Sequence, residues 1–277
     1  MAPSERPPPV IGFLTDFGFD GAAATCRGVM LAICPTAQVI DISHAIRKYA
    51  VLDGAFVLRA TLPYLSVGVH VAVVDPGVGT DRRPIAIRAD RGDVLVGPDN
   101  GLLLPAADAL GGAVDARELA NRDLWRPVVS STFHGRDVFA PTAAHLSAGN
   151  ASFADVGPEL SLGELVRLPR PRARAREGVV ETEVTYVDSF GNLRLAGGAD
   201  ELTAAFGSPE AALHVRVLVG GVDIGAAALV PSFGHVEEGE TLVYVDSTGD
   251  LAIAVSQGDL AAKTGATTGT PVVFDRR

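Results

Sequence analysis

The sequence predicts an α/β protein with an N-terminal α/β layered domain, whose sheet is mostly parallel, and a C-terminal antiparallel β-barrel domain. Two observations support this prediction. In the first part of the chain, short apolar runs alternate with segments of helical character, which is typical of α/β layer folds. After an arginine-rich segment, apolar residues recur at every second position, the period of antiparallel strands. We therefore expect an N-terminal domain over residues 1–168, a linker over 169–178 and a barrel over 179–277.

The elements expected in the N-terminal domain follow from apolar runs and the residues that bound them. The three consecutive prolines at 7–9 predict a start without regular structure. Short runs rich in β-branched residues predict strands at 10–15, 38–42, 69–74, 84–89 and 93–96. Longer segments predict helices at 20–34, 51–62 and 137–148. Asp20 is the expected N-cap of the first helix, Pro35 ends it, and Pro141 is tolerated in the first turn of the last.

The linker and the barrel are expected from a change in composition. Pro169 and Pro171 interrupt regular structure in the linker, and its arginines repel one another. A nucleic-acid patch is an alternative interpretation, but the segment is short and lacks interleaved aromatic residues. Beyond it, alternation predicts strands at 180–186, 213–217, 241–245, 251–255 and 271–274, separated by glycine-rich turns.

Composition limits the partners and the compartment. The net charge of −10 argues against binding to nucleic acid or to an anionic membrane. No apolar run is long enough to span a bilayer, and the N-terminus has no secretory pattern. Cys26 and Cys34 have neither zinc-site spacing nor a disulfide framework. We therefore expect a reduced, cytoplasmic protein.

Four polar clusters lie where strands of the N-terminal domain are expected to end. They are TDFGFDG at 15–21, DPGVGTDRRP at 75–84, GPDNG at 97–101 and STFHGRD at 131–137. Each cluster alone is also typical of a turn. Ligands of open parallel sheets bind beyond the carboxyl ends of the strands, so four such clusters together predict a binding site there.

A metal-dependent phosphoesterase is one interpretation of these clusters. They contain the right ligand types, namely Asp16, Asp75, Asp99, His134 and Asp137. However, arginines stand beside these residues in the sequence, and cations there would compete with a metal. The chain also has no GxGxxG, Walker, GxSxG or HExxH pattern. We expect neither a metal nor a cofactor.

Five motifs occur together in a distinctive order: FLTDFG, VVDPGVGT, VGPDNGLL, STFHGRDVFAP and VDSFGNL. In order and spacing they resemble the S-adenosyl-L-methionine (SAM) hydroxide adenosyltransferases, a family related to the fluorinase and chlorinase enzymes. The resemblance runs from Ile11 to about Phe274. It implies an α/β domain followed by a β-barrel. It also implies a homotrimer with active sites between the N-terminal domain of one subunit and the C-terminal domain of its neighbour.

The resemblance also implies roles for particular residues. The groups that position the attacking water or hydroxide are Asp75, Arg82 and His134. Asp16 matches the carboxylate that binds the ribose hydroxyls. The residues matched to the rest of the substrate are Asp188 and Asn192 for methionine, and Phe190, Phe233 and Ser247 for adenine.

Three positions favour water over halide as the nucleophile. The halogenases carry Tyr where this chain has Asp75, and the fluorinase carries Ser and Thr where it has Gly135 and Val78. The resemblance therefore implies hydrolysis of SAM to adenosine and L-methionine. The alternatives are halogenase-type substitution and a SAM- or nucleoside-binding protein. Leu195 and Ala196 depart from the Thr-Asn pair usual in the family.

The chemistry of the substrate suits these residues. Attack at C5′ expels a neutral thioether, so the leaving group needs no acid, and the enzyme has only to position a water and stabilise its ionised form. Arg82 can stabilise the developing hydroxide, and His134 can orient the water or share its proton. An arginine beside a carboxylate favours the ionised form and weakens it as a base. We therefore expect Asp75 mainly to orient the water and Arg82.

Overall fold

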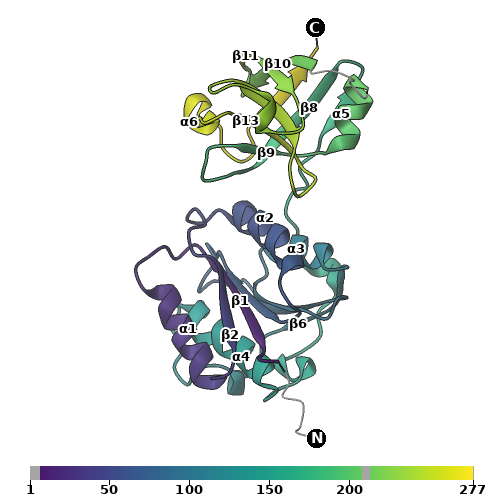
Figure 1. Cartoon of the computed structure of the whole chain (residues 1–277). Coiled ribbons are helices and arrows are strands. Elements are labelled where there is room, and N and C mark those ends of the chain that lie inside the picture. Colours follow the sequence, from purple (N-terminus) through teal and green to yellow (C-terminus); the bar gives the residue numbers. More distant parts are fainter. Residues whose placement is uncertain (1–6, 208–212, 277) are drawn as a thin grey trace, which may run out of the picture. The chain divides into compact units, whose positions relative to one another are not determined.

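The computed structural model describes residues 7–207 and 213–276, and the chain divides into two compact units, Met1–Leu168 and Pro169–Arg277 (Figure 1). The first unit is the α/β domain expected from the sequence, and the second is a β-barrel.

The N-terminal domain is built on a six-stranded sheet with strand order β2-β1-β3-β5-β4-β6. Its strands are β1 (Val10–Thr15), β2 (Gln38–Ser43), β3 (Val69–Val73), β4 (Pro84–Ala89), β5 (Val94–Pro98) and β6 (Ala113–Glu118). β1 is parallel to β2 and β3, and β3 is parallel to β5, whereas β4 is antiparallel to both of its neighbours. The mostly parallel sheet is thus confirmed.

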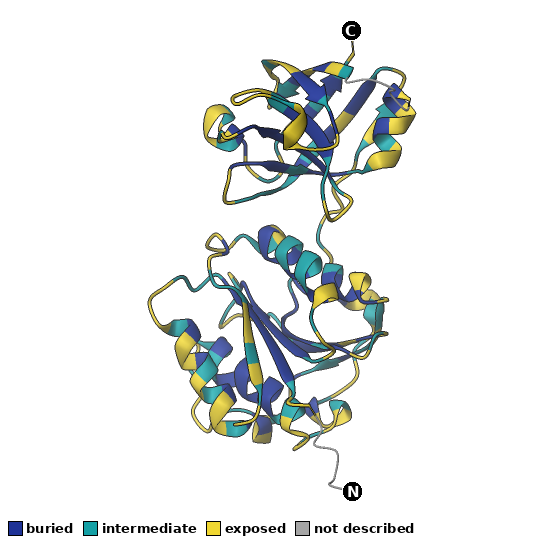
Figure 2. Ribbon diagram, viewed as in Figure 1, coloured by how far each residue is buried: buried dark blue, intermediate teal, exposed yellow. Residues whose placement is uncertain are grey.

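Helices cover both faces of this sheet, which is buried along its centre (Figures 1 and 2). The helices are α1 (Ala22–Ile33), α2 (Val51–Thr61), α3 (Leu104–Ala109) and α4 (Ala140–Ala148). α1 and α4 share one apolar core with the sheet, and α2 and α3 share the other. Short helical turns complete the domain: η1 (Leu62–Tyr64), η2 (Arg122–Leu124), η4 (Phe153–Val156) and η5 (Leu162–Glu164).

The structure corrects three details of the N-terminal prediction. The N-cap of α1 is Gly21, in the left-handed conformation, and not Asp20. The segment expected as one helix at 137–148 is a π-helical turn, η3 (Gly135–Phe139), that runs into α4. The helix α3 and the strand β6 were not predicted, because α3 is only six residues long and β6 lacks a β-branched run.

The C-terminal domain is a β-barrel, as predicted; it is closed and has seven strands, of which β9 and β11 were not predicted. Its strands are β8 (Val179–Val187), β9 (Leu193–Leu195), β10 (Leu213–Val219), β11 (Val222–Leu229), β12 (Thr241–Val245), β13 (Leu251–Val255) and β14 (Pro271–Asp275). Pairing of β14 with β8 closes it, and all neighbours are antiparallel except β11 and β12. Two helices, α5 (Ala199–Phe206) and α6 (Leu260–Thr264), and the turn η6 (Phe233–His235) accompany the barrel.

The segment expected as a linker contains a short strand, β7 (Arg174–Arg176). It pairs antiparallel with β8, from which Glu177 and Gly178 separate it. Gly178 has a φ of 72°, which glycine adopts without strain. The expectation of no regular structure there was wrong for these three residues, because a hairpin with β8 satisfies their backbone groups.

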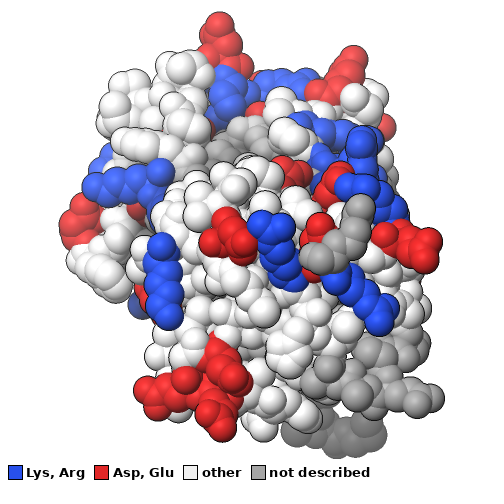
Figure 3. Space-filling model, turned by 90° about the horizontal axis from the view of Figure 1, so that it is seen from above, with Lys and Arg blue, Asp and Glu red and all other residues white. Residues whose placement is uncertain are grey.

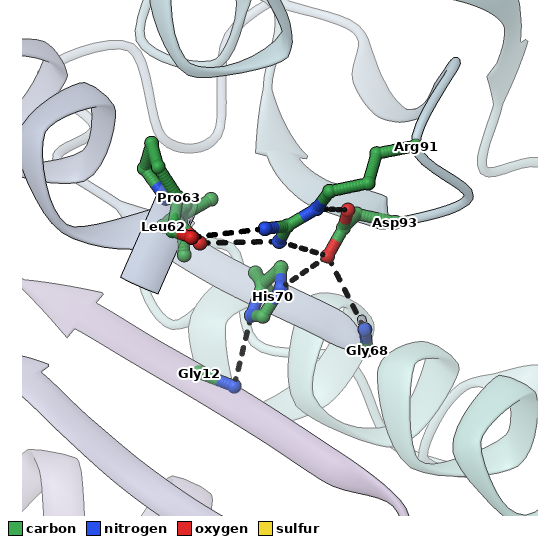
Figure 4. Close-up of polar contacts among 7 residues, drawn as sticks. All are labelled: Gly12, Leu62, Pro63, Gly68, His70, Arg91 and Asp93. Atoms are coloured by element: carbon green, nitrogen blue, oxygen red, sulfur yellow. Dashed lines mark hydrogen bonds and ion pairs between the residues drawn. The ribbon is translucent and has the colours of Figure 1, made fainter. Parts of the chain in front are cut away.

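A buried polar network joins β1 and β3 of the N-terminal sheet to the residue that precedes β5 (Figure 4). His70 and Asp93 are fully buried, and His70 Nε2 lies 2.9 Å from Asp93 Oδ1. Nδ1 of His70 accepts a hydrogen bond from the Gly12 amide on β1, so Nε2 carries the proton that bonds Asp93. Arg91 donates to both oxygens of Asp93. Burial opposes ionisation of Asp93, but the bonds from His70 and Arg91 outweigh it and hold the pKa of its carboxyl well below the usual range.

The surface charge is mixed. On the face in Figure 3, positive and negative side chains are interspersed. In the described part of the chain, no helix is long and apolar enough to cross a membrane.

Candidate active site

A pocket of about 280 Å³ opens at the carboxyl ends of β1 and β3 in the N-terminal domain. Asp16 directly follows β1, and Asp75 lies two residues after β3. His134 precedes the π-helical turn and lines the same pocket. Because β1 and β3 are parallel neighbours, their ends bring these side chains to one edge of the sheet.

Arg82 connects the catalytic candidates. Its Nε and Nη2 atoms donate to the two oxygens of Asp75 at 3.2 and 2.6 Å, in a bidentate ion pair. Nη2 also lies 3.1 Å from Nδ1 of His134. Both charged side chains are nearly buried, with exposed fractions of 7% for Arg82 and 4% for Asp75. The three residues predicted to position the nucleophile therefore form one hydrogen-bonded group.

His134 is neutral in this arrangement. Burial and the positive charge of Arg82 lower the pKa of its imidazole below the usual value of 6.5. Nδ1 faces a guanidinium donor, so it accepts, and the proton of the neutral ring resides on Nε2. The ring thus presents a donor, and not a base, at Nε2.

One nitrogen of the Arg82 guanidinium bonds neither Asp75 nor His134. Its Nη1 atom is buried and has no hydrogen-bond partner among the described residues. A buried donor without a partner is costly, and such groups are rare unless a ligand or water satisfies them. The ring of Phe139 lies 5.4 Å from the guanidinium carbon and supports the same group.

The carboxylate of Asp16 is held by the backbone amide of Tyr49, a residue with a strained conformation. Its Oδ2 accepts a hydrogen bond from the amide of Tyr49 at 2.9 Å. Tyr49 has a φ of 66°, and the other described non-glycine residue with a positive φ is Gln257, at 53°. Tyr49 lines this pocket and Gln257 lines a second pocket in the barrel. Strained backbone of this kind clusters at functional sites.

Gly135 leaves room for an aromatic ring. A Cβ atom there would lie 3.0 Å from Cζ of Phe17, which is tighter than ordinary contact. Phe17 in turn packs edge-on against Phe133, with ring centroids 5.7 Å apart. Val78, which also lines the pocket, offers only methyl groups. A hydroxyl-bearing side chain at 135 would therefore require the Phe17 ring to shift by a few tenths of an ångström.

The carboxylates considered as metal ligands are engaged elsewhere. Asp99 is paired with Arg83 and Asp137 with Arg136, as Asp75 is with Arg82. Over residues 7–207 and 213–276, no three His, Cys, Asp or Glu side chains are grouped as a metal site. The pairing leaves these carboxylates as partners of cations.

The barrel carries a larger pocket of about 800 Å³. All five residues predicted for this domain line it: Asp188, Phe190, Asn192, Phe233 and Ser247. Phe190 is 75% exposed, and Phe233 packs edge-on against Tyr244 with centroids 5.3 Å apart. The structure thus groups the predicted residues in two sets, one in each domain.

Two hairpin turns of the same design border the barrel pocket. The β8–β9 turn reads DSFGN from Asp188, and the β12–β13 turn reads DSTGD from Asp246. In each, Oδ1 of the aspartate accepts the amides two and four residues later. In each, the aspartate amide donates to the carbonyl four residues later, and the fourth residue is a glycine with positive φ. Asn192 Nδ2 also donates to Asp188 Oδ2 at 3.0 Å, which fixes the carboxylate orientation.

Several pocket residues were not predicted from the sequence. They are Phe17, Lys48 and Tyr49 in the first pocket, and Arg194, Tyr244, Asp246 and Gln257 in the second. The repeated D-S-x-G pattern was the one available signal for Asp246, since it marks a second turn like that of Asp188. Lys48 and Tyr49 lie in a loop after β2 that no motif identifies.

Family models confirm the resemblance. The model described as the SAM hydroxide adenosyltransferase N-terminal domain matches residues 11–157, and the corresponding C-terminal model matches residues 182–273. The chain belongs to the SAM hydroxide adenosyltransferase family. Both pockets lie inside the matched regions.

Relatives and solved structures agree with this family. The chain is 48% identical to a protein named (R)-S-adenosyl-L-methionine hydrolase from Salinispora tropica, over 95% of this chain and 96% of that protein. A more distant relative is a fluorinase from Actinoplanes sp., 29% identical over 91% of this chain and 93% of that enzyme. A crystal structure of an uncharacterized conserved protein from Thermotoga maritima matches with a TM-score of 0.87 and 36% identity, over 96% of this chain and all of that chain.

Proposed function

We propose that this chain hydrolyses (R)-S-adenosyl-L-methionine to adenosine and L-methionine by attack of water or hydroxide at C5′ of the ribose. The observation that carries the proposal is the Asp75–Arg82–His134 group, with Arg82 Nη1 buried and unpartnered in the described structure. The naming of relatives at 48% identity supports the substrate. Since L already specifies the amino-acid carbon, the (R) of that name denotes the sulfonium centre.

The proposed step balances without a cofactor. The water oxygen forms a bond to C5′, the C5′–S bond breaks, and its electron pair remains on sulfur as the neutral thioether of methionine. One proton of the water is released to solvent. Arg82 Nη1 and His134 Nε2–H are donors that stabilise negative charge on the oxygen, and such preorganised donors act on developing charge without reorganisation. Asp75 holds the guanidinium in place.

The same geometry disfavours a halide. The Asp75 carboxylate, paired with Arg82, repels an entering anion and offsets much of the attraction of the guanidinium. Gly135 and Val78 supply no hydroxyl to a desolvated halide. A water, which is neutral until it loses its proton, suffers neither penalty. The hydrolase therefore fits this pocket better than the halogenase alternative.

The remaining substrate contacts are proposed for the residues of the two pockets. Asp16 takes the ribose hydroxyls, Asp188 and Asn192 the amino-acid part, and Phe190, Phe233 and Ser247 the adenine. We propose that a homotrimer joins the N-terminal pocket of one subunit to the barrel pocket of its neighbour. Two free buried cysteines, Cys26 and Cys34, fit work in the reducing cytoplasm.

Isotope labelling tests the reaction. Pure protein is incubated with SAM of defined sulfur configuration in ¹⁸O-enriched water, with and without chloride or fluoride. We expect one labelled oxygen on C5′ of adenosine, none in methionine, faster turnover of the (R) epimer and no 5′-halo product. A 5′-halo-5′-deoxyadenosine as main product, or unlabelled adenosine, would overturn the proposal.

Complementation tests the shared site. His134→Ala and Asp188→Ala subunits are each expected to be nearly inactive. Mixed after mild dissociation, they should regain part of the activity, because some interfaces then hold both intact residues. Activity of a monomer in sedimentation, or no recovery in verified mixed trimers, would exclude the shared site.

A further inference from the structure

Arg194 occupies a special place on the barrel. It lies on β9, opposite Ala252 on β13, which in turn lies opposite Tyr244 on β12. Its neighbours Leu193 and Leu195 belong to the barrel core, whereas Ala252 and Tyr244 belong to a separate apolar cluster. Arg194 and Tyr244, on either side of the buried Ala252, both line the barrel pocket.

Two aspartates from the matched turns flank Arg194. Its Nη1 forms an ion pair with Oδ2 of Asp246, whose side chain is only 2% exposed. Its Nη2 also forms a longer ion-pair contact with Oδ2 of Asp188, at 3.9 Å and without a hydrogen bond. Asp246 is thus buried by its partner, while Arg194 remains 21% exposed on the pocket side.

The guanidinium has donors left over. A guanidinium offers five N–H groups, and the described structure gives Nε and Nη2 of Arg194 no hydrogen bond. Asp188, 17% exposed, accepts from its own turn and from Asn192, but its oxygens have further lone pairs. The pocket therefore presents a fixed anion and a fixed cation next to each other.

Adjacent charges of opposite sign complement the amino-acid end of SAM, in which an ammonium and a carboxylate share one carbon. Asp188 suits the ammonium. Planar Arg suits a carboxylate better than any other side chain, and its orientation here is fixed by Asp246. The closer pair of Arg194 with the buried Asp246 leaves only the longer 3.9 Å contact with Asp188, so the Asp188 carboxylate keeps the capacity to bind the ammonium.

We infer that Arg194, held by Asp246, is a specificity-determining residue that recognises the α-carboxylate of the substrate. The inference rests on the proposed function for its substrate. It adds a residue that lies just before the two positions, Leu195 and Ala196, at which this chain departs from the family pattern.

The test compares SAM with decarboxylated SAM, which keeps the sulfonium and the amine but lacks the carboxylate. Removing Arg194 alone would leave Asp246 buried without a cation, so the main variant is the double change Arg194→Gln with Asp246→Asn. Arg194→Lys retains the charge without the planar fork. The matched control is Arg216→Gln, which removes an exposed ion pair with Asp223 in the same barrel.

We expect wild type and the control to prefer SAM by about 10- to 100-fold in kcat/KM, the range of a hydrogen bond to a charged group. In the double variant, kcat/KM for SAM should fall by that factor, whereas kcat/KM for the decarboxylated compound should change less than about three-fold. Arg194→Lys should lie between. Equal losses for both compounds in the folded double variant, or no preference in wild type, would overturn the inference.

Calorimetry separates this outcome from failure of the proposed reaction. Binding of the two compounds is measured in the His134→Ala background, with and without the double change. Discrimination that depends on Arg194 without any wild-type turnover would leave the inference standing and remove the hydrolase. Turnover of SAM without discrimination between the two compounds would overturn the inference and leave the hydrolase standing.

Discussion

The Nη2 atom of Arg82 lies 3.1 Å from Nδ1 of His134, so the imidazole must stay neutral to accept its hydrogen bond. Protonation of the ring would place two cations face to face. The group that stabilises the nucleophile is therefore assembled in one protonation state of His134.

This relationship predicts the acid limb of the pH profile. Burial and Arg82 lower the pKa of His134 below 6.5, so the neutral form persists through neutral pH and is lost only as pH falls through that lowered pKa. We expect kcat/KM to be flat near neutrality and to fall on a limb centred below 6.5. Rates across pH 4.5 to 8 check this, with Arg216→Gln, which removes an exposed cation of the barrel, as the control. A limb centred above 6.5 would show that the protonated ring is the stabilised one.

Removing either donor should slow the chemical step. His134→Ala and Arg82→Ala are expected to lower kcat by about 10²–10³-fold each, the usual cost of one preorganised donor. Arg82→Ala also leaves Asp75 without its cation, so Arg82→Lys is measured beside it. Single-turnover rates and equilibrium binding separate kcat from affinity. Turnover near wild type in both alanine variants would remove these residues from the mechanism.

A serine at position 135 should not create a halogenase. Its Cβ would lie 3.0 Å from Phe17 Cζ, so the ring would have to shift by a few tenths of an ångström in the pocket that His134 also lines. We expect Gly135→Ser to lose up to about 100-fold in kcat, as small misplacements can cost. Adding Phe17→Leu should restore part of it. Product analysis in chloride should still show adenosine; a halogenated product from Gly135→Ser alone would contradict this reading.

The ribose contact is tested with a deoxy substrate. Asp16 can accept hydrogen bonds from both vicinal hydroxyls while the Tyr49 amide donates one hydrogen bond to its Oδ2. Wild type should lose about 10-fold or more in kcat/KM on 2′-deoxy-SAM. Asp16→Ala should lose much less kcat/KM when 2′-deoxy-SAM replaces SAM. Equal losses in the two backgrounds would show that Asp16 does not contact that hydroxyl.

The buried network of Figure 4 should govern the stability of the N-terminal domain. His70→Leu removes one donor from the buried Asp93 carboxylate and is expected to cost about 2–3 kcal/mol, as does loss of a hydrogen bond to a charged group. Arg88→Gln, which removes an exposed partner of Asp115, should cost less than about 1 kcal/mol. Denaturant titration compares them. Matching losses would mean that the network contributes no more than a surface pair.

The same network sets a pH dependence of folding. The folded-state pKa of Asp93 is lowered, so its contribution is complete above the unfolded value near 3.8 and is lost as pH falls further. Wild-type unfolding free energy should therefore drop steeply below pH 4. Asp93→Asn, already destabilised at neutral pH, should show a shallower drop. Parallel curves would assign acid unfolding to other carboxylates.

The local sequence pattern was enough to predict the elements that are buried on both faces or that end at a residue such as proline. The run VHVAV of β3 and the stop at Pro35 after α1 were predicted within a residue or two. Pattern failed where length or context decides, as in the six-residue α3, and in β7, which forms only because β8 is beside it.

The same distinction applies to the candidate site: a contact within one motif could be predicted from the sequence, and a contact between distant segments could not. Asp75 and Arg82 lie seven residues apart in one motif, and the structure pairs them directly. Arg194 and Asp246 come from hairpins far apart in the chain, and only the pairing of β9 with β13 brings them together. His70 looked like an ordinary strand residue, because nothing local reveals that Asp93 will lie beneath it.

Tyr49 and Gln257 limit which substitutions can make this protein more heat-resistant without loss of activity. A left-handed residue other than glycine costs on the order of 1–2 kcal/mol, so a screen for higher Tm alone would enrich glycine or asparagine at these two positions. Both side chains line pockets, and the enriched variants would trade turnover for thermal tolerance. A library meant to raise Tm and keep activity must therefore hold residues 49 and 257 constant and draw its changes from exposed helix faces.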